Sequence, residues 1–285
     1  MAVKNYAQYL NNIPVMPDVA SKVLNMADSK DSSFQSLEDL IKVDPGLTSR
    51  ILRIANSAMY ARQKEVTQLR TAITLLGLKT IKNLVILATG ASLFAASKQT
   101  PFYHFFWRHS IITAFLARDL AIKTGKRGLA DEAFVAGLLH NIGQVALYFS
   151  DRENYEKMLI EAGTTGQRIS ELEEGLYGVN HKTVGHSVLS AWNFPTVYAD
   201  TAHEHGNNNI TSEHKQVIIL VSTADFLASN LSLLKDNPKD LNLLQPFLPF
   251  LGLSIAALAV IQGEYMGQLN QDKLFLECQD LFNLN

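Results

Sequence analysis

Histidine is the residue type in this sequence that could most readily do chemistry, and its distribution along the chain is uneven. All eight histidines lie after residue 100 of the 285-residue chain. Imidazole binds transition metals and transfers protons near neutral pH. A lone histidine on an apolar helix is more often a hydrogen-bonded core residue or a solvent-exposed one. We expect that plain structural role for His104, His186, His203 and His214.

Other residue types give weaker signals. The segment 123–128 is a short basic loop that could contact a phosphate, but it lacks the P-loop spacing, and basic residues are common at helix C-termini. Cys278 has no histidine near it in the sequence, so nucleophilic catalysis is not indicated. The aromatic residues between 102 and 107 are typical of packing between lobes.

Composition places the chain among globular proteins with a substantial core. Apolar residues make up 47% of the chain and charged residues 18%, which excludes a disordered protein. A net charge of -2 gives no general field for nucleic acid, so we expect no nucleic-acid partner. The single cysteine and the absence of a secretory signal indicate a cytoplasmic location. The longest apolar stretch, 247–261, contains Pro249 and is too short for a membrane span.

Helical periodicity appears almost everywhere along the chain, and the alternation typical of strands almost nowhere, so we expect an all-α fold. Breaks at 97–101 and 235–249 predict an N-terminal lobe at 1–100, a C-terminal lobe at 101–234 that packs on it, and a helical tail at 235–285. Helices are expected after Pro17, from Ser36 and from Leu47. The later predicted helices are 69–76, 78–97, 103–124, 130–140, 151–162, 168–176, 181–192, 196–204, 214–230 and 253–268.

A series of short motifs resembles one known family. The motifs in the N-terminal lobe are IPVMP (13–17), VDPGLT (43–48), ILRIANSA (51–58), AI (72–73) and LG (76–77). The motifs in the C-terminal lobe are WRHS (107–110), GLLHNIG (137–143), HKTVG (181–185) and WNFP (192–195). In this order, over about residues 13–230, they resemble the HDOD family, a regulatory branch of the HD and HD-GYP phosphohydrolase superfamily. The resemblance implies that the C-terminal lobe is an HD-like helical bundle.

The resemblance also implies a metal site. HD phosphohydrolases hold a divalent metal with an early His, a His-Asp pair and a late Asp. The matching positions here are His109, His140, Asn141 and Asp225, so the pair's Asp is replaced by an amide. Fe, Mn or Zn suits such a mixture of imidazole and carboxylate. The alternative is a polar network in which these side chains satisfy one another without metal.

Two more histidines resemble ligands of the multinuclear HD-GYP enzymes, namely His181 and His205. Those enzymes have a His-His pair where this chain has His205 followed by Gly206. Active relatives also carry a phosphate-binding Lys where this chain has Gln144, and the GYP segment is absent after residue 206. Together with Asn141, these departures remove charge from the site, so the sequence indicates a protein without hydrolytic turnover.

Three functions follow from these observations. We expect a regulatory signal-transduction module that binds a ligand, with a small nucleotide as a candidate, or a protein partner, for which the N-terminal lobe offers a surface. The alternative is a metal-dependent phosphohydrolase acting on a nucleotide or phosphoester. A third hypothesis is a structural scaffold, which needs neither metal nor ligand.

Overall fold

The computed structural model describes residues 19, 22–23, 26, 34–56, 66–93, 100–232 and 240–284. Within these residues the chain forms helices joined by turns, and no strand is present. The predicted all-α fold is therefore confirmed. The helix expected after Pro17 falls mostly outside the described residues.

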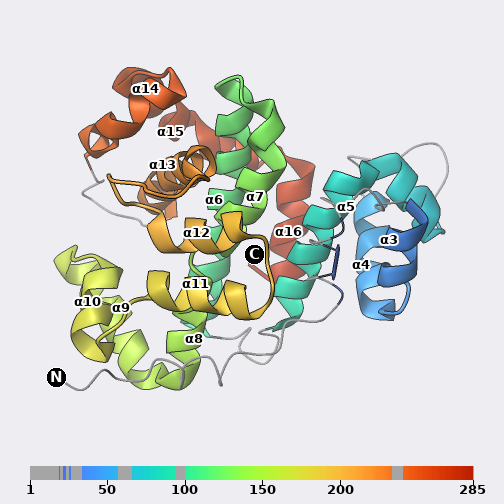
Figure 1. Cartoon of the computed structure of the whole chain (residues 1–285), viewed down its shortest axis with the longest axis horizontal. Helices are drawn as coiled ribbons and strands as arrows, with labels where there is room; N and C mark the ends of the chain where they lie inside the picture. Colours follow the sequence, from blue (N-terminus) through green and yellow to red (C-terminus); the bar gives the residue numbers. More distant parts are fainter. Residues whose placement is uncertain are drawn as a thin grey trace.

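The N-terminal lobe contains α3 (Phe34–Ile41), α4 (Pro45–Ala55) and α5 (Leu69–Leu93), and α3 and α4 both pack against α5 (Figure 1). The Asp44 carboxylate accepts a hydrogen bond from the backbone N–H of Leu47 at 2.9 Å, which caps α4. At Gly77 the backbone of α5 is not helical, with a φ of +82° that favours glycine. This residue separates the two helices predicted at 69–76 and 78–97.

The C-terminal lobe is a bundle in which α6 packs against α7 and α13, while α11 packs against α8 and α12. A hairpin of α9 and α10 lies at one end of the bundle, next to α8 (Figure 1). The bounds are α6 (Pro101–Lys123), the 3-10 turn η2 (Arg127–Leu129), α7 (Ala130–Leu139), α8 (Ile142–Ser150), α9 (Arg152–Thr165), α10 (Ile169–Tyr177), α11 (His181–Ala191), α12 (Thr196–Glu204) and α13 (Lys215–Ser232).

The sequence patterns do not predict α8, since the expected helices end at 140 and resume at 151. Every side chain of α8 from Ile142 to Tyr148 is buried. A helix that is covered on all sides has no polar face, and the amphipathic period on which the prediction depends is then absent.

Gly143 sets the distance between α8 and α11. A Cβ at this position would lie 2.0 Å from the carbonyl oxygen of His181 and 2.6 Å from the backbone nitrogen of Gly185. Only a residue without a side chain permits so close an approach of two backbones. The glycine therefore brings the first residue of α11 next to the segment that carries His140.

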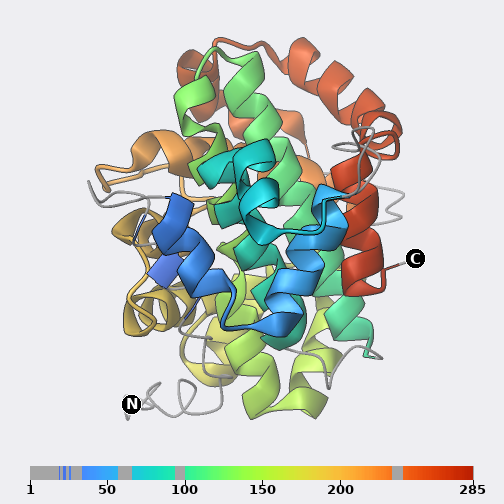
Figure 2. The ribbon, with the colours of Figure 1, turned by 90° about the vertical axis from the view of Figure 1, so that its right-hand side faces the viewer.

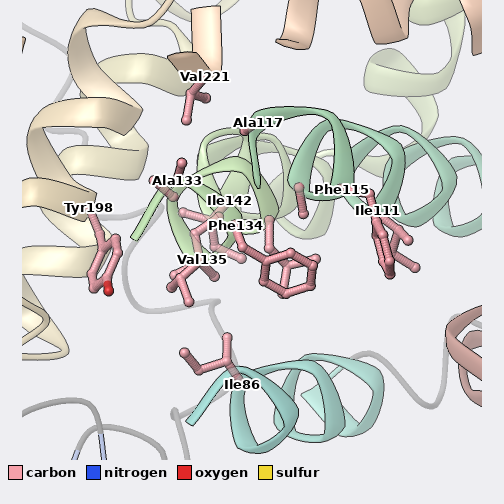
Figure 3. Packing of buried hydrophobic residues seen from close by; sticks show 14 of the residues in the cluster. Ile86, Ile111, Phe115, Ala117, Ala133, Phe134, Val135, Ile142, Tyr198 and Val221 are labelled. Atoms are coloured by element: carbon pink, nitrogen blue, oxygen red, sulfur yellow. The ribbon is translucent and has the colours of Figure 1, made fainter. Parts of the chain in front are cut away.

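The two lobes share a continuous apolar core. Figure 3 shows Ile86 of α5 facing the side chains of Phe134 and Val135 on α7, with Ile111 and Phe115 of α6 beside them. Each of these side chains is at most 1% exposed. The N-terminal lobe therefore packs on α7, the helix that ends just before His140.

The tail contains η3 (Leu241–Phe247), α14 (Leu248–Leu251), α15 (Ile255–Leu269) and α16 (Lys273–Phe282), of which only a helix close to α15 is predicted by the sequence. Helix α16 returns to contact both α5 and α6 (Figure 2). The Phe282 ring packs on Trp107 at 4.5 Å between ring centroids, and Phe275 packs on Phe115 at 5.5 Å. The tail is thus packed onto both lobes, while the division into three domains stays a prediction.

Among the described residues, the segment Arg127–Ser150 is long and apolar enough to cross a membrane by length and composition, and the pair Leu241–Leu251 and Ile255–Leu269, bent by 107°, would be a second only as one broken span. The segment Arg127–Ser150 comprises η2, α7 and α8, and 89% of its most apolar window is buried inside the fold. A core helix of a globular protein meets the same criterion, and the extensive burial favours that interpretation.

Candidate metal centre

Three helices bring the three best-matched ligand positions together. His109 lies in the middle of α6, His140 follows the last residue of α7, and Asp225 lies in α13. The Oδ1 atom of Asp225 is 3.0 Å from Nε2 of His109 and 3.6 Å from Nε2 of His140. One donor atom from each residue lies within 4.8 Å of the other two. Two ligands bound about 2.1 Å from the same ion are separated by roughly 3–4 Å, so the spacing suits one metal.

The imidazole of His140 is held in one orientation. Its Nδ1 atom lies 2.7 Å from the carbonyl oxygen of Gly137, which can only accept, so Nδ1 carries the proton. The electron pair is then on Nε2, which is buried and has no hydrogen-bond partner. Burial also lowers the pKa of His140, with Asp225 opposing that shift, so the ring is neutral at neutral pH.

Asp225 supplies the charge of the cluster. Burial alone would raise the pKa of its carboxyl group, but the hydrogen bond from His109 and the electrostatic interaction with His140 outweigh this and hold the pKa well below its usual value. A quarter of the side chain remains exposed, so solvent reaches the cluster at this residue. One carboxylate and two imidazoles fit a divalent transition metal, and the unpaired Nε2 of His140 is the atom that such an ion would satisfy.

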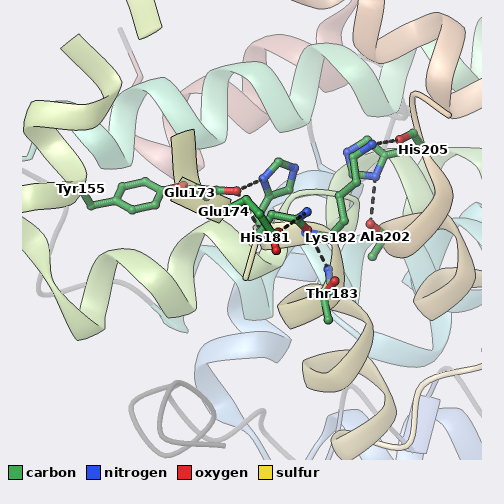
Figure 4. Close-up of polar contacts among 9 residues, drawn as sticks. Tyr155, Glu173, Glu174, His181, Lys182, Thr183, Ala202 and His205 are labelled. Atoms are coloured by element: carbon green, nitrogen blue, oxygen red, sulfur yellow. Dashed lines mark hydrogen bonds and ion pairs between the residues drawn. The ribbon is translucent and has the colours of Figure 1, made fainter. Parts of the chain in front are cut away.

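His205 and His181 extend the row of imidazoles away from this cluster. The ring of His205 lies 4.9 Å from that of His140 and 5.6 Å from that of His181, measured between centroids. Its Nδ1 atom lies 3.0 Å from the carbonyl of Ala202 (Figure 4). The same atom lies 3.1 Å from the carbonyl of Thr201. Burial, the repulsion that a protonated His140 would exert and the charge of Lys182 hold the pKa of His205 well below its usual value.

Asn141 occupies the position of the missing Asp, directly after His140. It is buried and precedes α8, and its side chain does not cap that helix. Its backbone carbonyl accepts a hydrogen bond from Gln144 at 2.9 Å. A role of Asn141 as a metal ligand therefore stays a prediction.

Two charged residues beside the site were not expected from the sequence. Glu173, in the middle of α10, contacts Nδ1 of His181 at 2.5 Å. Lys182 donates from Nζ to the carbonyl of His205 at 2.6 Å, and burial lowers its pKa although Asp225 opposes the shift. Lys182 is therefore a cation beside the site that the sequence patterns do not predict. Lys182 directly follows His181 in the HKTVG motif, which is the signal that could have revealed it.

The remaining histidines lie outside the cluster. His186 and His203 face each other across α11 and α12, with ring centroids 5.5 Å apart, and His203 is exposed. His214 lies 3.0 Å from the hydroxyl of Thr196, and His104 contacts Tyr103. These contacts are those of surface and packing residues.

The comparisons with known proteins point to one family. A family model described as the HDOD domain matches residues 13–208. An uncharacterised protein of Treponema pallidum (strain Nichols) is 24% identical over 220 residues, which is 77% of this chain and 42% of that protein. The chain therefore spans less than half the length of this curated relative.

Three solved structures have the same fold. An HDOD domain protein of unknown function from Geobacter sulfurreducens has a TM-score of 0.76 and 22% identity, over 94% of this chain and 93% of that one. A Shewanella amazonensis protein, provisionally named a phosphohydrolase, has a TM-score of 0.73 and 21% identity, over 97% of each chain. A Marinobacter aquaeolei protein, provisionally named a signal transduction protein, has a TM-score of 0.76 and 21% identity, over 96% of this chain and 60% of that one.

Proposed function

Because the chain belongs to the HDOD family, we propose that it is a regulatory signal-transduction module that binds a divalent metal at His109, His140 and Asp225 without turning over a substrate. Its output acts through a protein partner, and a small nucleotide is a candidate ligand. A cytoplasmic location, without a nucleic-acid partner or a membrane span, belongs to the same proposal.

The main support for a bound metal ion is the buried Nε2 atom of His140. Buried polar atoms in folded proteins nearly always have a partner, and this atom has none among the described residues. Its electron pair faces an anionic carboxylate oxygen 3.6 Å away, which is unfavourable unless a cation lies between them. Protonation of His140 is opposed by burial, so a metal ion is the better source of that charge.

The lack of negative charge at Asn141 is the reason to expect no turnover. A bound divalent ion would neutralise a phosphoryl group and lower the pKa of its water. Efficient hydrolysis in this superfamily also relies on the anionic partner of the pair, and Asn141 supplies an uncharged amide there. With Asp225 as the single carboxylate of the cluster, His109 and His140 complete a ligand set for one ion. We propose Fe, Mn or Zn as that ion.

The alternative, a metal-dependent phosphohydrolase, gains support from Lys182. This side chain places an ammonium group beside His205, where it could stabilise an anionic substrate. A Shewanella amazonensis protein of the same fold is provisionally named a phosphohydrolase. A nucleotide or another phosphoester is the substrate class that this hypothesis predicts.

Elemental analysis of freshly purified protein, combined with a phosphodiesterase and phosphatase screen, separates these functions. We expect about one equivalent of bound metal, its loss in His140→Ala, its retention in the matched control His203→Ala, and no phosphate release. Metal-dependent phosphate release that disappears in His140→Ala and rises in Asn141→Asp would establish the hydrolase. If the purified protein contains neither metal nor ligand, the structural scaffold is favoured. Affinity purification of a stable partner would then show which protein the scaffold binds.

A further inference from the structure

Lys182, in the first turn of α11, carries a half-buried ammonium group beside the candidate metal centre. Its Nζ atom donates to the carbonyl oxygen of His205 at 2.6 Å (Figure 4). The same atom donates to Oδ1 of Asn207 at 3.1 Å. An ammonium group has three N–H donors, so one donor of Lys182 has no partner among the described residues. The side chain is therefore held in place while one of its donors stays available.

Both acceptors that Lys182 contacts are neutral, so its charge is not compensated at short range. No ion pair joins it to a carboxylate within the part of the chain that the structure describes. Asp225 and Glu173 act on the ammonium group only from a greater distance, as does the like charge of Arg168. Partial burial removes water from this cation, and a bound anion would offset that cost.

The surroundings of Lys182 are open to solvent on one side. Gly206 and Asn207 are exposed, and a quarter of the Asp225 side chain is exposed as well. A Cβ on Gly206 would lie 3.6 Å from Nζ, so a side chain at this position would begin to cover the ammonium group. The backbone N–H of Gly206 donates to Oγ of Ser222 at 2.9 Å, which holds this turn in place. An anion in solution can therefore reach Lys182 from this side.

The balance of charge around Lys182 depends on the metal ion. Apart from the imidazoles, the groups that act on the site are the carboxylates of Asp225 and Glu173 and the ammonium group of Lys182. Arg168 is exposed and paired with Glu171 at 3.9 Å. These groups leave an excess of one negative charge, which a divalent ion at the proposed centre turns into an excess of one positive charge. We therefore expect an anion to bind the metal-loaded protein and not the metal-free one.

We propose that Lys182 recognises the terminal phosphate of a small phosphorylated ligand, of the class of a nucleoside monophosphate. This inference rests on the proposed metal centre and specifies which group of the ligand is bound and by which side chain. A terminal phosphate carries roughly two negative charges at neutral pH and several acceptor oxygens, so it suits the point charge of a lysine. A phosphodiester carries a single charge and should bind less tightly.

A purely structural role for Lys182 would be to hold the turn after α12 through His205 and Asn207. Two variants separate this role from recognition of phosphate. Lys182→Gln removes the charge but keeps a polar donor, and Lys182→Arg keeps the charge. The structural role predicts the same affinity for phosphate in every folded variant, whereas recognition predicts that affinity follows the charge.

The first test uses isothermal titration calorimetry on tag-free protein that has been loaded with Co2+ and desalted. We expect the wild type to bind adenosine monophosphate and inorganic phosphate, to bind cyclic adenosine monophosphate less tightly, and not to bind adenosine. The affinity for adenosine monophosphate should fall by about 10- to 100-fold in Lys182→Gln, with the Co2+ content unchanged, and should largely recover in Lys182→Arg. Lys157→Gln, on the exposed face of α9, is the matched control and should bind as the wild type does.

The second test needs no variant. Lysines of the intact wild-type protein are acetylated with an activated ester, and the labelling of each lysine is measured by mass spectrometry. We expect adenosine monophosphate to suppress the labelling of Lys182 in metal-loaded protein but not in metal-free protein, while adenosine has no effect and Lys157 is labelled equally throughout. If Lys182 stays equally reactive with adenosine monophosphate present, the inference is overturned even when every variant fails to fold.

The outcomes distinguish the inference from the function on which it rests. Protein that binds no metal removes both together. Metal-loaded protein that binds neither phosphate nor adenosine monophosphate, or that binds them equally tightly in Lys182→Gln, removes the inference and leaves the metal centre in place. Binding of adenosine monophosphate that leads to release of phosphate supports the inference but replaces the regulatory module with a hydrolase.

Discussion

Replacing Gly143 by alanine tests whether the close approach of α8 and α11 holds the site together. The added Cβ would lie 2.0 Å from the carbonyl oxygen of His181, 2.6 Å from the nitrogen of Gly185 and 2.8 Å from the carbonyl carbon of His181. All three atoms belong to the backbone, so no side-chain rotation can relieve the overlap. Ordinary contact begins near 3.4 Å, and the two helices must therefore separate by more than an ångström.

The loss of unfolding free energy in Gly143→Ala can be estimated from the cost of overpacking a core. Inserting a methylene group into a packed core costs roughly 1–3 kcal/mol, and contact with rigid backbone places this substitution at about 3 kcal/mol or above. For a chain of this size, each kcal/mol lowers Tm by roughly 2–4 °C, so we expect a fall of roughly 6–12 °C. The matched control is Gly163→Ala on α9, where nothing lies within 4 Å of the added Cβ. That control should gain about 0.5–1 kcal/mol from helix propensity.

Thermal unfolding followed by circular dichroism, on metal-free protein, measures both changes. The same samples should show that Gly143→Ala weakens metal binding, because Gly143 lies three residues after His140 and the added Cβ pushes this segment away from α11. If Gly143→Ala unfolds at the wild-type temperature, α8 and α11 are not packed as described, and the placement of His181 beside His205 loses its support.

Three further predictions follow from the packing and from the pKa shifts. Phe282→Ala should lower the unfolding free energy by about 3–5 kcal/mol in urea titrations, because the ring is fully buried on Trp107. Tyr265→Phe should cost about 1 kcal/mol in the same assay, through loss of the 2.8 Å hydrogen bond to Asp119. The pKa of His205 is lowered in the folded protein, so the unfolded chain takes up a proton first. Metal-free protein should therefore lose stability as pH falls below about 6.5, by up to about 1.4 kcal/mol per pH unit, and His205→Gln should flatten that slope.

The sequence predicts the family and most of the helices, because amphipathic periods and short motifs are local. The HDOD resemblance is confirmed by the family model, and helix α6 begins two residues before its predicted start at 103. Helix α8 is not predicted, because a helix without a polar face has no period to detect. Helix α16 is likewise not predicted, although Phe275 and Phe282 are buried.

Residues of the candidate site could be predicted from the sequence only where they lie in a recognisable motif. The positions of His109, His140 and Asp225 follow from the resemblance, and the fold places them together. Glu173 could not be predicted, because its role depends on the packing of α10 against α11 and on a hydroxyl from α9. Charge at the site depends in the same way on long-range contacts, which is why the ammonium group beside His205 was unexpected.

The return of α16 to α5 and α6 has a consequence for how the chain acquires its structure. The Arg118–Asp272 ion pair joins residues 154 positions apart, and the aromatic contacts of Phe275 and Phe282 close loops of similar length. Until the ribosome has made α16, the faces of Phe115 and Trp107 that Phe275 and Phe282 cover stay exposed, although Phe134 already packs on Phe115 and Phe106 on Trp107. The apolar core can therefore close only after the last helix has been synthesised, and contacts of such large sequence separation form slowly.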